Sequence, residues 1–194
     1  MRTRPRLRRS LALSLLLVIA GLVPATASAG SSDGTHCIFP DGTDFNQIWG
    51  VTEAVVWFNC TSIGAGEDWR VADGWGVNSR FQGKPKGFIP AGDTPIADFL
   101  AKFVGVKVVV DAGTSSEQVY RFTDTSRLLV DGNLVNAVTM GVMRDLPVGH
   151  HIVDAYWTMS ALHCDGFPKP KGGCLPAGDS LGFSTEFDVV AKQP

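Results

Sequence analysis

A long alternation of apolar and polar side chains between His150 and about Leu162 constrains the fold most strongly. Successive side chains of a β-strand point to opposite faces, so a shift of one residue would exchange the two sets. The polar set is expected to face solvent. The other set is apolar apart from His151, so we expect it to face the core and expect His151 and Trp157 to be structural. The expected core-facing set consists of His151, Val153, Ala155, Trp157, Met159 and Ala161.

Shorter apolar runs elsewhere in the chain are separated by Gly, Pro, Asp and Asn, a pattern typical of an all-β domain. The segment 61–92 is rich in glycine and predicts a long irregular loop region in the N-terminal part of the domain. From Val104 the apolar period becomes two, with Val104, Val106 and Val108 expected on one face. The remaining strands are expected near 51–60, 120–122, 128–130, 135–143 and 183–189.

One short helix is expected near residues 95–103. Thr94 can cap it, Pro95 suits the first helical position, and Asp98 would lie near the positive end of the helix dipole. Apolar residues then recur at i, i+3, i+4 and i+7, the spacing of one helix face. These residues are Ile96, Phe99, Leu100 and Phe103.

The C-terminal half combines a Pro147-x-Gly149 turn, an aromatic residue two positions later, the long alternating strand and a hairpin to the last strand. Over roughly residues 104–190 this arrangement resembles the end of an immunoglobulin-like or fibronectin-III-like β-sandwich. It also resembles small secreted proteins of high-GC Gram-positive bacteria. The resemblance implies an immunoglobulin-like β-sandwich with a structural or binding role and no catalytic residues to carry over. His151 departs from the pattern, because such turns often place Tyr there.

The first 29 residues have the three parts of a secretory signal peptide. A basic stretch precedes an apolar run from Leu11 to Val23, and Ala27-Ser28-Ala29 predicts cleavage after Ala29. This run is well short of the ~20 residues that a helix needs to cross a bilayer. We therefore expect a secreted protein with no membrane partner after cleavage. It would form a single domain over 30–194, with a loose tail at 30–36.

Removal of the signal peptide would leave an acidic chain. The first 29 residues hold five of the 17 basic residues and no acidic residue, so 12 basic and 19 acidic residues remain, a formal charge of −7. An acidic surface argues against nucleic acid and against anionic membranes as partners.

All four cysteines follow the predicted cleavage site. An even number in an oxidising compartment predicts two disulfides, and four cysteines allow three pairings. We favour Cys37–Cys60 together with Cys164–Cys174, which encloses a short loop rich in Gly, Pro and Lys. The alternative of a metal site lacks the short C-x-x-C spacing that zinc sites use.

The sequence contains no spacing typical of a nucleophile with its base or of a metal-ligand set. His150 and His151 point to opposite faces of a strand, so they cannot easily share a metal. We therefore expect no catalytic residue and no cofactor. The leading interpretation is a non-catalytic extracellular binding or structural module, with an extracellular protein or glycan as its partner. The alternatives are a secreted hydrolase that uses Asp and His residues from loops and a weak metal-binding protein.

Tryptophans offer the best candidate for a binding site. Two of them lie in a stretch rich in Gly and Asp that we expect to be a loop, where aromatic rings among polar groups can form a ligand platform. The alternative is that both rings fill the edge of the domain without binding anything. The residues predicted to bind a ligand are Trp69, Arg70, Asp73 and Trp75.

Overall fold

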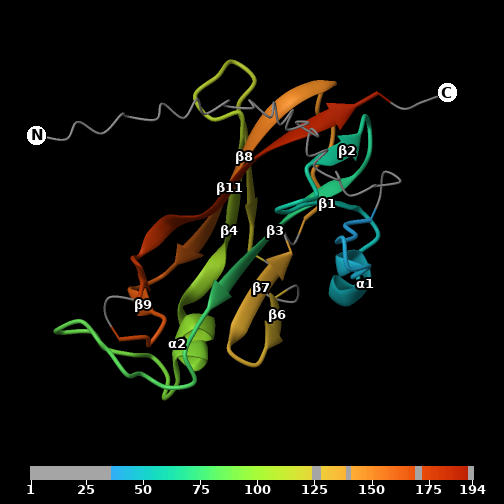
Figure 1. The fold of residues 1–194 in the computed structure, drawn as a ribbon. Coiled ribbons are helices and arrows are strands. Elements are labelled where there is room, and N and C mark those ends of the chain that lie inside the picture. The colour runs from blue at the N-terminus through green and yellow to red at the C-terminus, as the bar shows by residue number, and fades with distance from the viewer. Residues whose placement is uncertain (1–35, 124–127, 139–140, 169–171, 192–194) are drawn as a thin grey trace, which may run out of the picture.

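The computed structural model describes residues 36–123, 128–138, 141–168 and 172–191. The predicted signal peptide and nearly all of the tail after it lie outside these residues, so both stay predictions. The described chain consists mostly of β-strands, with two short helices (Figure 1). This confirms the expected mostly β class.

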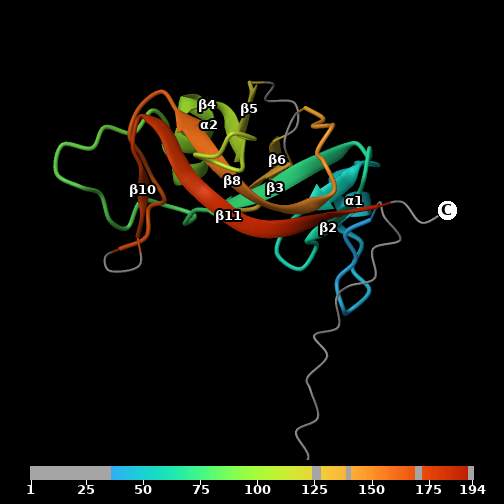
Figure 2. The same cartoon turned by 90° about the horizontal axis from the view of Figure 1, so that it is seen from above.

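The larger sheet has five strands and curls like half of a barrel (Figures 1 and 2). The last strand of the described residues, β11 (Gly178–Val190), pairs in parallel with β2 (Ser62–Gly64) and antiparallel with β8 (Gly149–Met159). The strand β4 (Phe103–Val110) pairs antiparallel with both β8 and β5 (Gln118–Phe122). In spatial order the strands are β2, β11, β8, β4 and β5.

A second sheet of four strands packs against the first, and β9 (His163–Cys164) with β10 (Cys174–Leu175) forms a separate two-stranded hairpin. Both larger sheets contain one parallel pair, whereas an immunoglobulin sandwich consists of two antiparallel sheets. The immunoglobulin-like arrangement therefore stays a prediction. The order in the second sheet is β1 (Ala54–Val56), β3 (Trp69–Gly76), β7 (Leu134–Val138) and β6 (Leu128–Asp131).

Strand β8 has the expected alternation. Its core-facing side chains are buried between the two larger sheets, and His151 is buried among them at 5% exposure. Trp157 packs edge-on against the buried ring of Phe99 at 5.4 Å between ring centroids. The strand ends at Met159, so Ala161, which we expected on the same face, is exposed.

Strand β4 differs from the expected pattern at its beginning. Val104 is exposed, whereas Val106 and Val108 are buried. The cause is a register shift between Phe103 and Gly105, which turns the side chain between them to the outside. Gly105 is required there, because an added Cβ would lie 2.2 Å from the Phe122 carbonyl oxygen.

The expectation that residues 61–92 form one irregular loop is wrong for its central part. Residues Trp69–Gly76 form β3, which pairs with β1 on one side and β7 on the other. The first five residues of β3 are all buried, because one face packs on the main core and the other on the cluster around Trp49 and Val51. A strand that is buried on both faces loses the alternation that identifies a strand in a sequence.

Helix α2 (Pro95–Lys102) occurs where it was expected, and the Thr94 hydroxyl accepts the Ala97 amide at 3.2 Å as its cap. Its buried face differs from the expected one, because Asp98 and Lys102 are buried and Leu100 is exposed. The five-residue helix α1 (Phe45–Trp49), with Asp44 as its N-cap, was not expected.

Two disulfides join the cysteines in the favoured pairing. Cys37–Cys60 links the segment before α1 to the turn after β1, and Cys164–Cys174 joins β9 to β10. Two disulfides in one small domain are typical of proteins in an oxidising compartment.

Candidate functional site

Two segments that are far apart in the sequence meet at the end of the molecule opposite α1 (Figures 1 and 2). We call this end the loop pole; it consists of the described residues of 77–94 and 163–175. The Asn78 amide donates to the Asp165 carbonyl at 2.7 Å, and the Gln82 amide donates to the Gly166 carbonyl at 2.8 Å. Gly166 has φ +80°, and a Cβ there would lie 3.0 Å from the Arg80 carbonyl oxygen. This glycine therefore permits the two segments to approach so closely.

The disulfide hairpin at the loop pole is held by a buried carboxylate. Asp165 Oδ1 accepts the Phe167 amide at 3.0 Å, and Oδ2 accepts the Gly173 amide at 2.6 Å. Both oxygens therefore satisfy backbone N–H groups of the same loop, next to the Cys164–Cys174 bond. We conclude that Asp165 shapes the hairpin.

A pocket of about 340 Å³ opens between the two segments of the loop pole. One wall is the run Lys84-Pro85-Lys86, and the other contains Phe167 and the Cys164–Cys174 disulfide. The Phe167 side chain is 38% exposed, so its ring is available to a ligand. The lining of the pocket thus combines apolar surface with two lysine residues.

The two lysines of the pocket differ from most of the cationic side chains that the structure describes. Among the described residues, no ion pair involves Lys84 or Lys86, whereas Lys102, Lys107 and Arg144 each contact an aspartate. The Lys84 ammonium lies 5.2 Å from the centre of the Phe81 ring. Lys84 and Lys86 outnumber the one carboxylate of the lining, Asp165, so the pocket has a net positive charge in a chain that is acidic after the predicted cleavage site.

A series of buried hydrogen bonds joins β3, β9 and α2 next to the loop pole. The Trp75 indole N–H donates to His163 Nε2 at 3.0 Å, so the proton of the neutral imidazole resides on Nδ1 and is donated to Asp98 Oδ2 at 2.8 Å. Burial lowers the pKa of His163, which favours this neutral form. Burial alone would raise the pKa of Asp98, but hydrogen bonds from Lys102, the Ala91 amide and His163 together hold it below its ordinary value.

Lys102 connects these hydrogen bonds to the first segment of the pole and to the residue that precedes the second segment. Its Nζ contacts Asp98 Oδ1 at 2.6 Å and donates to the carbonyl oxygens of Leu162 and Ile89 at 2.6 and 3.2 Å. Each polar group thus has partners inside the protein, which is typical of a structural network. We therefore assign this network of hydrogen bonds a structural role, which is to hold the loop pole on α2 and β3.

Two of the four predicted binding residues lie away from the pocket. The Trp69 ring is completely buried and packs against Phe187 at 5.2 Å between centroids, so it belongs to the core. Arg70 is 4% exposed and contacts Glu53 at 2.7 Å, and this hydrogen bond lowers the pKa of Glu53 to about 2.

The other two predicted residues lie toward the loop pole. Trp75 is partly exposed, and its ring lies behind Gly173 of the pocket wall, where an added Cβ would be 3.6 Å from it. Asp73 is 9% exposed, and burial raises its pKa to about 7, although the Gly74 amide donates to it at 2.7 Å. A Cβ at Gly182 would lie 2.0 Å from Asp73 Oδ2, so this carboxyl occupies the space that a side chain at Gly182 would need.

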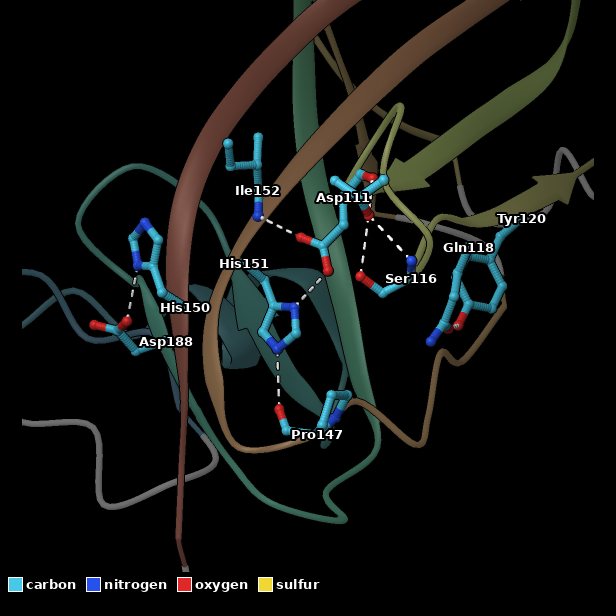
Figure 3. A network of polar contacts seen from close by, with 10 residues as sticks. Asp111, Ser116, Gln118, Tyr120, Pro147, His150, His151, Ile152 and Asp188 are labelled. Carbon is cyan, nitrogen blue, oxygen red and sulfur yellow. Dashed lines mark hydrogen bonds and ion pairs between the residues drawn. The ribbon is translucent and has the colours of Figure 1, made fainter.

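The adjacent histidines of β8 point to opposite faces (Figure 3). His151 lies inside, with Nδ1 at 2.8 Å from Asp111 Oδ2 and Nε2 at 2.9 Å from the Pro147 carbonyl oxygen. His150 lies outside, 3.0 Å from Asp188, and this contact raises the pKa of His150. His151 thus joins the turn before β8 to the turn after β4.

The part of the chain that the structure describes contains no group of three or more His, Cys, Asp or Glu side chains arranged to hold a metal ion. None of its helices is long and apolar enough to span a bilayer. Comparisons with protein-family models, with curated proteins and with solved structures found no match.

Sequence reasoning missed the residues that line the pocket. A signal was present, because Lys-Pro-Lys occurs twice, at 84–86 and at 169–171, and these two tripeptides hold four of the 12 basic residues after the predicted cleavage site. Residues 169–171 lie outside the described residues. The repeat alone does not show that the two segments meet, since about 80 residues separate them.

Proposed function

We propose that this chain is an exported, non-catalytic binding module that holds its ligand in the pocket of the loop pole. The observation that carries the proposal is the pocket itself, built by two segments that backbone hydrogen bonds fix to each other. Its volume of about 340 Å³ lies at the lower end of the range of small-molecule sites, roughly 300–1,000 Å³. A rigid β scaffold that presents loops at one end is a common arrangement for binding.

Export rests on the predicted signal peptide and agrees with the two disulfides. N-terminal sequencing of protein from a culture supernatant should read Gly30 as the first residue. Protein that keeps the apolar run Leu11 to Val23 would contradict this part of the proposal.

Binding can be tested before the ligand is identified. The chain from Gly30 is immobilised, and extracellular proteins and a glycan array are screened for capture. Phe167→Ala should remove one wall of the pocket and reduce capture strongly. Ile48→Ala is the matched control, because Ile48 is an exposed apolar side chain at the opposite end, on α1. Capture that responds equally to both changes would place the binding site elsewhere.

One observation favours the alternative of a hydrolase. A buried carboxyl with a pKa near 7, as in Asp73, is a feature of many acid–base catalysts. The Gly74 amide and the Trp157 indole lie beside it, and neither is a nucleophile. A panel of ester, peptide and glycoside substrates tests this alternative. Turnover that Asp73→Asn abolishes would favour an enzyme over a binding module.

A further inference from the structure

We infer that the pocket of the loop pole selects a short acidic saccharide, meaning one or two sugar rings that carry a carboxylate or sulfate group. This inference rests on the proposed binding function and adds the chemical class of the ligand.

The charge of the pocket points to an anion. Lys84 and Lys86 line the same pocket, and no carboxylate of the described residues forms an ion pair with either ammonium. The lining contains one carboxylate, that of Asp165, and its two oxygens are directed at backbone N–H groups of the hairpin. Two lysines against one aspartate leave the lining with a net positive charge. An anionic oxygen group would receive charge-assisted hydrogen bonds, which are stronger than neutral ones.

The walls of the pocket point to a ring with an apolar face. Phe167, which is partly exposed, and Pro85, which has no backbone donor, both line the pocket. Sugar rings have polar edges and C–H faces that pack on such surfaces. The volume of about 340 Å³ limits the occupant to a small number of rings.

The overall charge argues against a long polyanion. The chain after the predicted cleavage site has a formal charge of −7, so a polymer that extends beyond the pocket would meet an acidic surface. An extended acidic peptide would meet the same repulsion and would leave the enclosed part of the pocket unfilled. A short ligand places its charge at the lysines and avoids the remainder of the protein.

Calorimetric titration of the chain from Gly30 tests the inference with four probes: a glucuronate-containing disaccharide, a sulfated disaccharide, a neutral glucose disaccharide and a dipeptide of Asp and Glu. We expect the acidic disaccharides to bind at least about tenfold more tightly than the neutral one. Higher salt should weaken their binding, because the lysines are exposed.

Variants separate charge from shape. The double change Lys84→Gln and Lys86→Gln should weaken binding of the acidic disaccharides about tenfold and leave the neutral one unchanged. The double change to Arg should restore binding. The double change Arg121→Gln and Arg144→Gln controls for net charge, because it also removes two positive charges and both residues lie outside the pocket lining. Thermal melting should be the same for all variants, since these side chains are exposed.

The outcomes distinguish this inference from the proposed function. If acidic and neutral disaccharides bind with equal affinity, and the Gln variants do not change it, the inference of an anionic ligand is overturned. The proposed function as a binding module would then still stand. Binding of the acidic dipeptide alone would overturn the saccharide in favour of a peptide. No binding of any probe would overturn this inference, while the proposed function would fail only if the capture screen also failed.

Discussion

The buried carboxyl of Asp73 predicts an unusual dependence of stability on pH. Its pKa is about 7 in the folded protein, against an ordinary value of 3.8, because burial penalises the charged form. Between these two values the folded state holds the proton more tightly than the unfolded state. Stability contributed by Asp73 is therefore greatest below about pH 4, falls as the pH rises, and is fully lost above pH 7.

The magnitude follows from the size of the shift. A shift from 3.8 to about 7 is roughly three pKa units, and each unit corresponds to about 1.4 kcal/mol, so the penalty at pH 8 is on the order of 4 kcal/mol. Asp73→Asn removes the charge and keeps the shape. The difference in free energy of unfolding between this variant and the wild type should grow by about 3–4 kcal/mol from pH 4 to pH 8.

The comparison between the two proteins isolates this effect from other titrating groups. His163 has the opposite effect on stability, because burial lowers its pKa in the folded protein. As the pH falls below about 6.5 the unfolded chain takes up a proton at His163 before the folded protein does, so stability decreases. Glu53 and Asp179, each with a pKa of about 2, stabilise above pH 4 and lose this contribution between about pH 4 and pH 2. These groups are present in both proteins, so their contributions cancel in the difference.

The assay is urea unfolding at pH 4, 6 and 8 with both disulfides intact, followed by tryptophan fluorescence. The slope of the transition should be equal in both proteins, which shows that the denatured states are comparable. A difference between variant and wild type that stays constant within about 1 kcal/mol would refute the reasoning. It would mean that the carboxyl has a charged partner or a route to water.

Three other changes test the fold. His151→Ala should lower the free energy of unfolding by about 1–3 kcal/mol, because it removes a buried ring whose two nitrogens contact Asp111 and the Pro147 carbonyl oxygen. His150→Ala should have a negligible effect, because His150 is exposed, and equal effects of the two changes would show that the register of β8 is wrong. Replacing Cys164 and Cys174 by Ser should lower the free energy of unfolding, measured by chemical denaturation, by roughly 2.5–3 kcal/mol. The same change should weaken ligand capture, and unchanged capture would show that binding does not need the disulfide hairpin. Trp69→Ala should lower the free energy of unfolding by about 3–5 kcal/mol, measured by urea or thermal unfolding, because the ring is completely buried. A variant as stable as the wild type would contradict the assignment of Trp69 to the core.

The features that could be predicted from the sequence depend on local patterns. Strand β8 was identified because one of its faces is buried and the other is exposed or partly exposed. Helix α2 was identified from Thr94, Pro95 and an apolar spacing, all of which lie within ten residues. The two disulfides followed from the number and position of the cysteines.

The features that were missed depend on contacts between distant segments. Strand β3 is buried on both faces by elements that precede and follow it, so its alternation is lost. Asp98 and Lys102 form a buried pair, and Asp98 also contacts His163, about 60 residues later in the sequence. The pocket likewise needs the approach of Gly166 to the segment around Arg80, which no local spacing reveals.

The central claim is that the loop pole holds the ligand, and residue-resolved NMR tests it most directly. Backbone amide signals of the ¹⁵N-labelled chain from Gly30 are recorded while the glucuronate-containing disaccharide, or any ligand found by the capture screen, is added. We expect the largest shifts at residues 82–87, 164–168 and 172–174, with little change in α1 or on the outer face of β8. Saturable shifts confined to α1 or to the outer face of the five-stranded sheet would contradict the account.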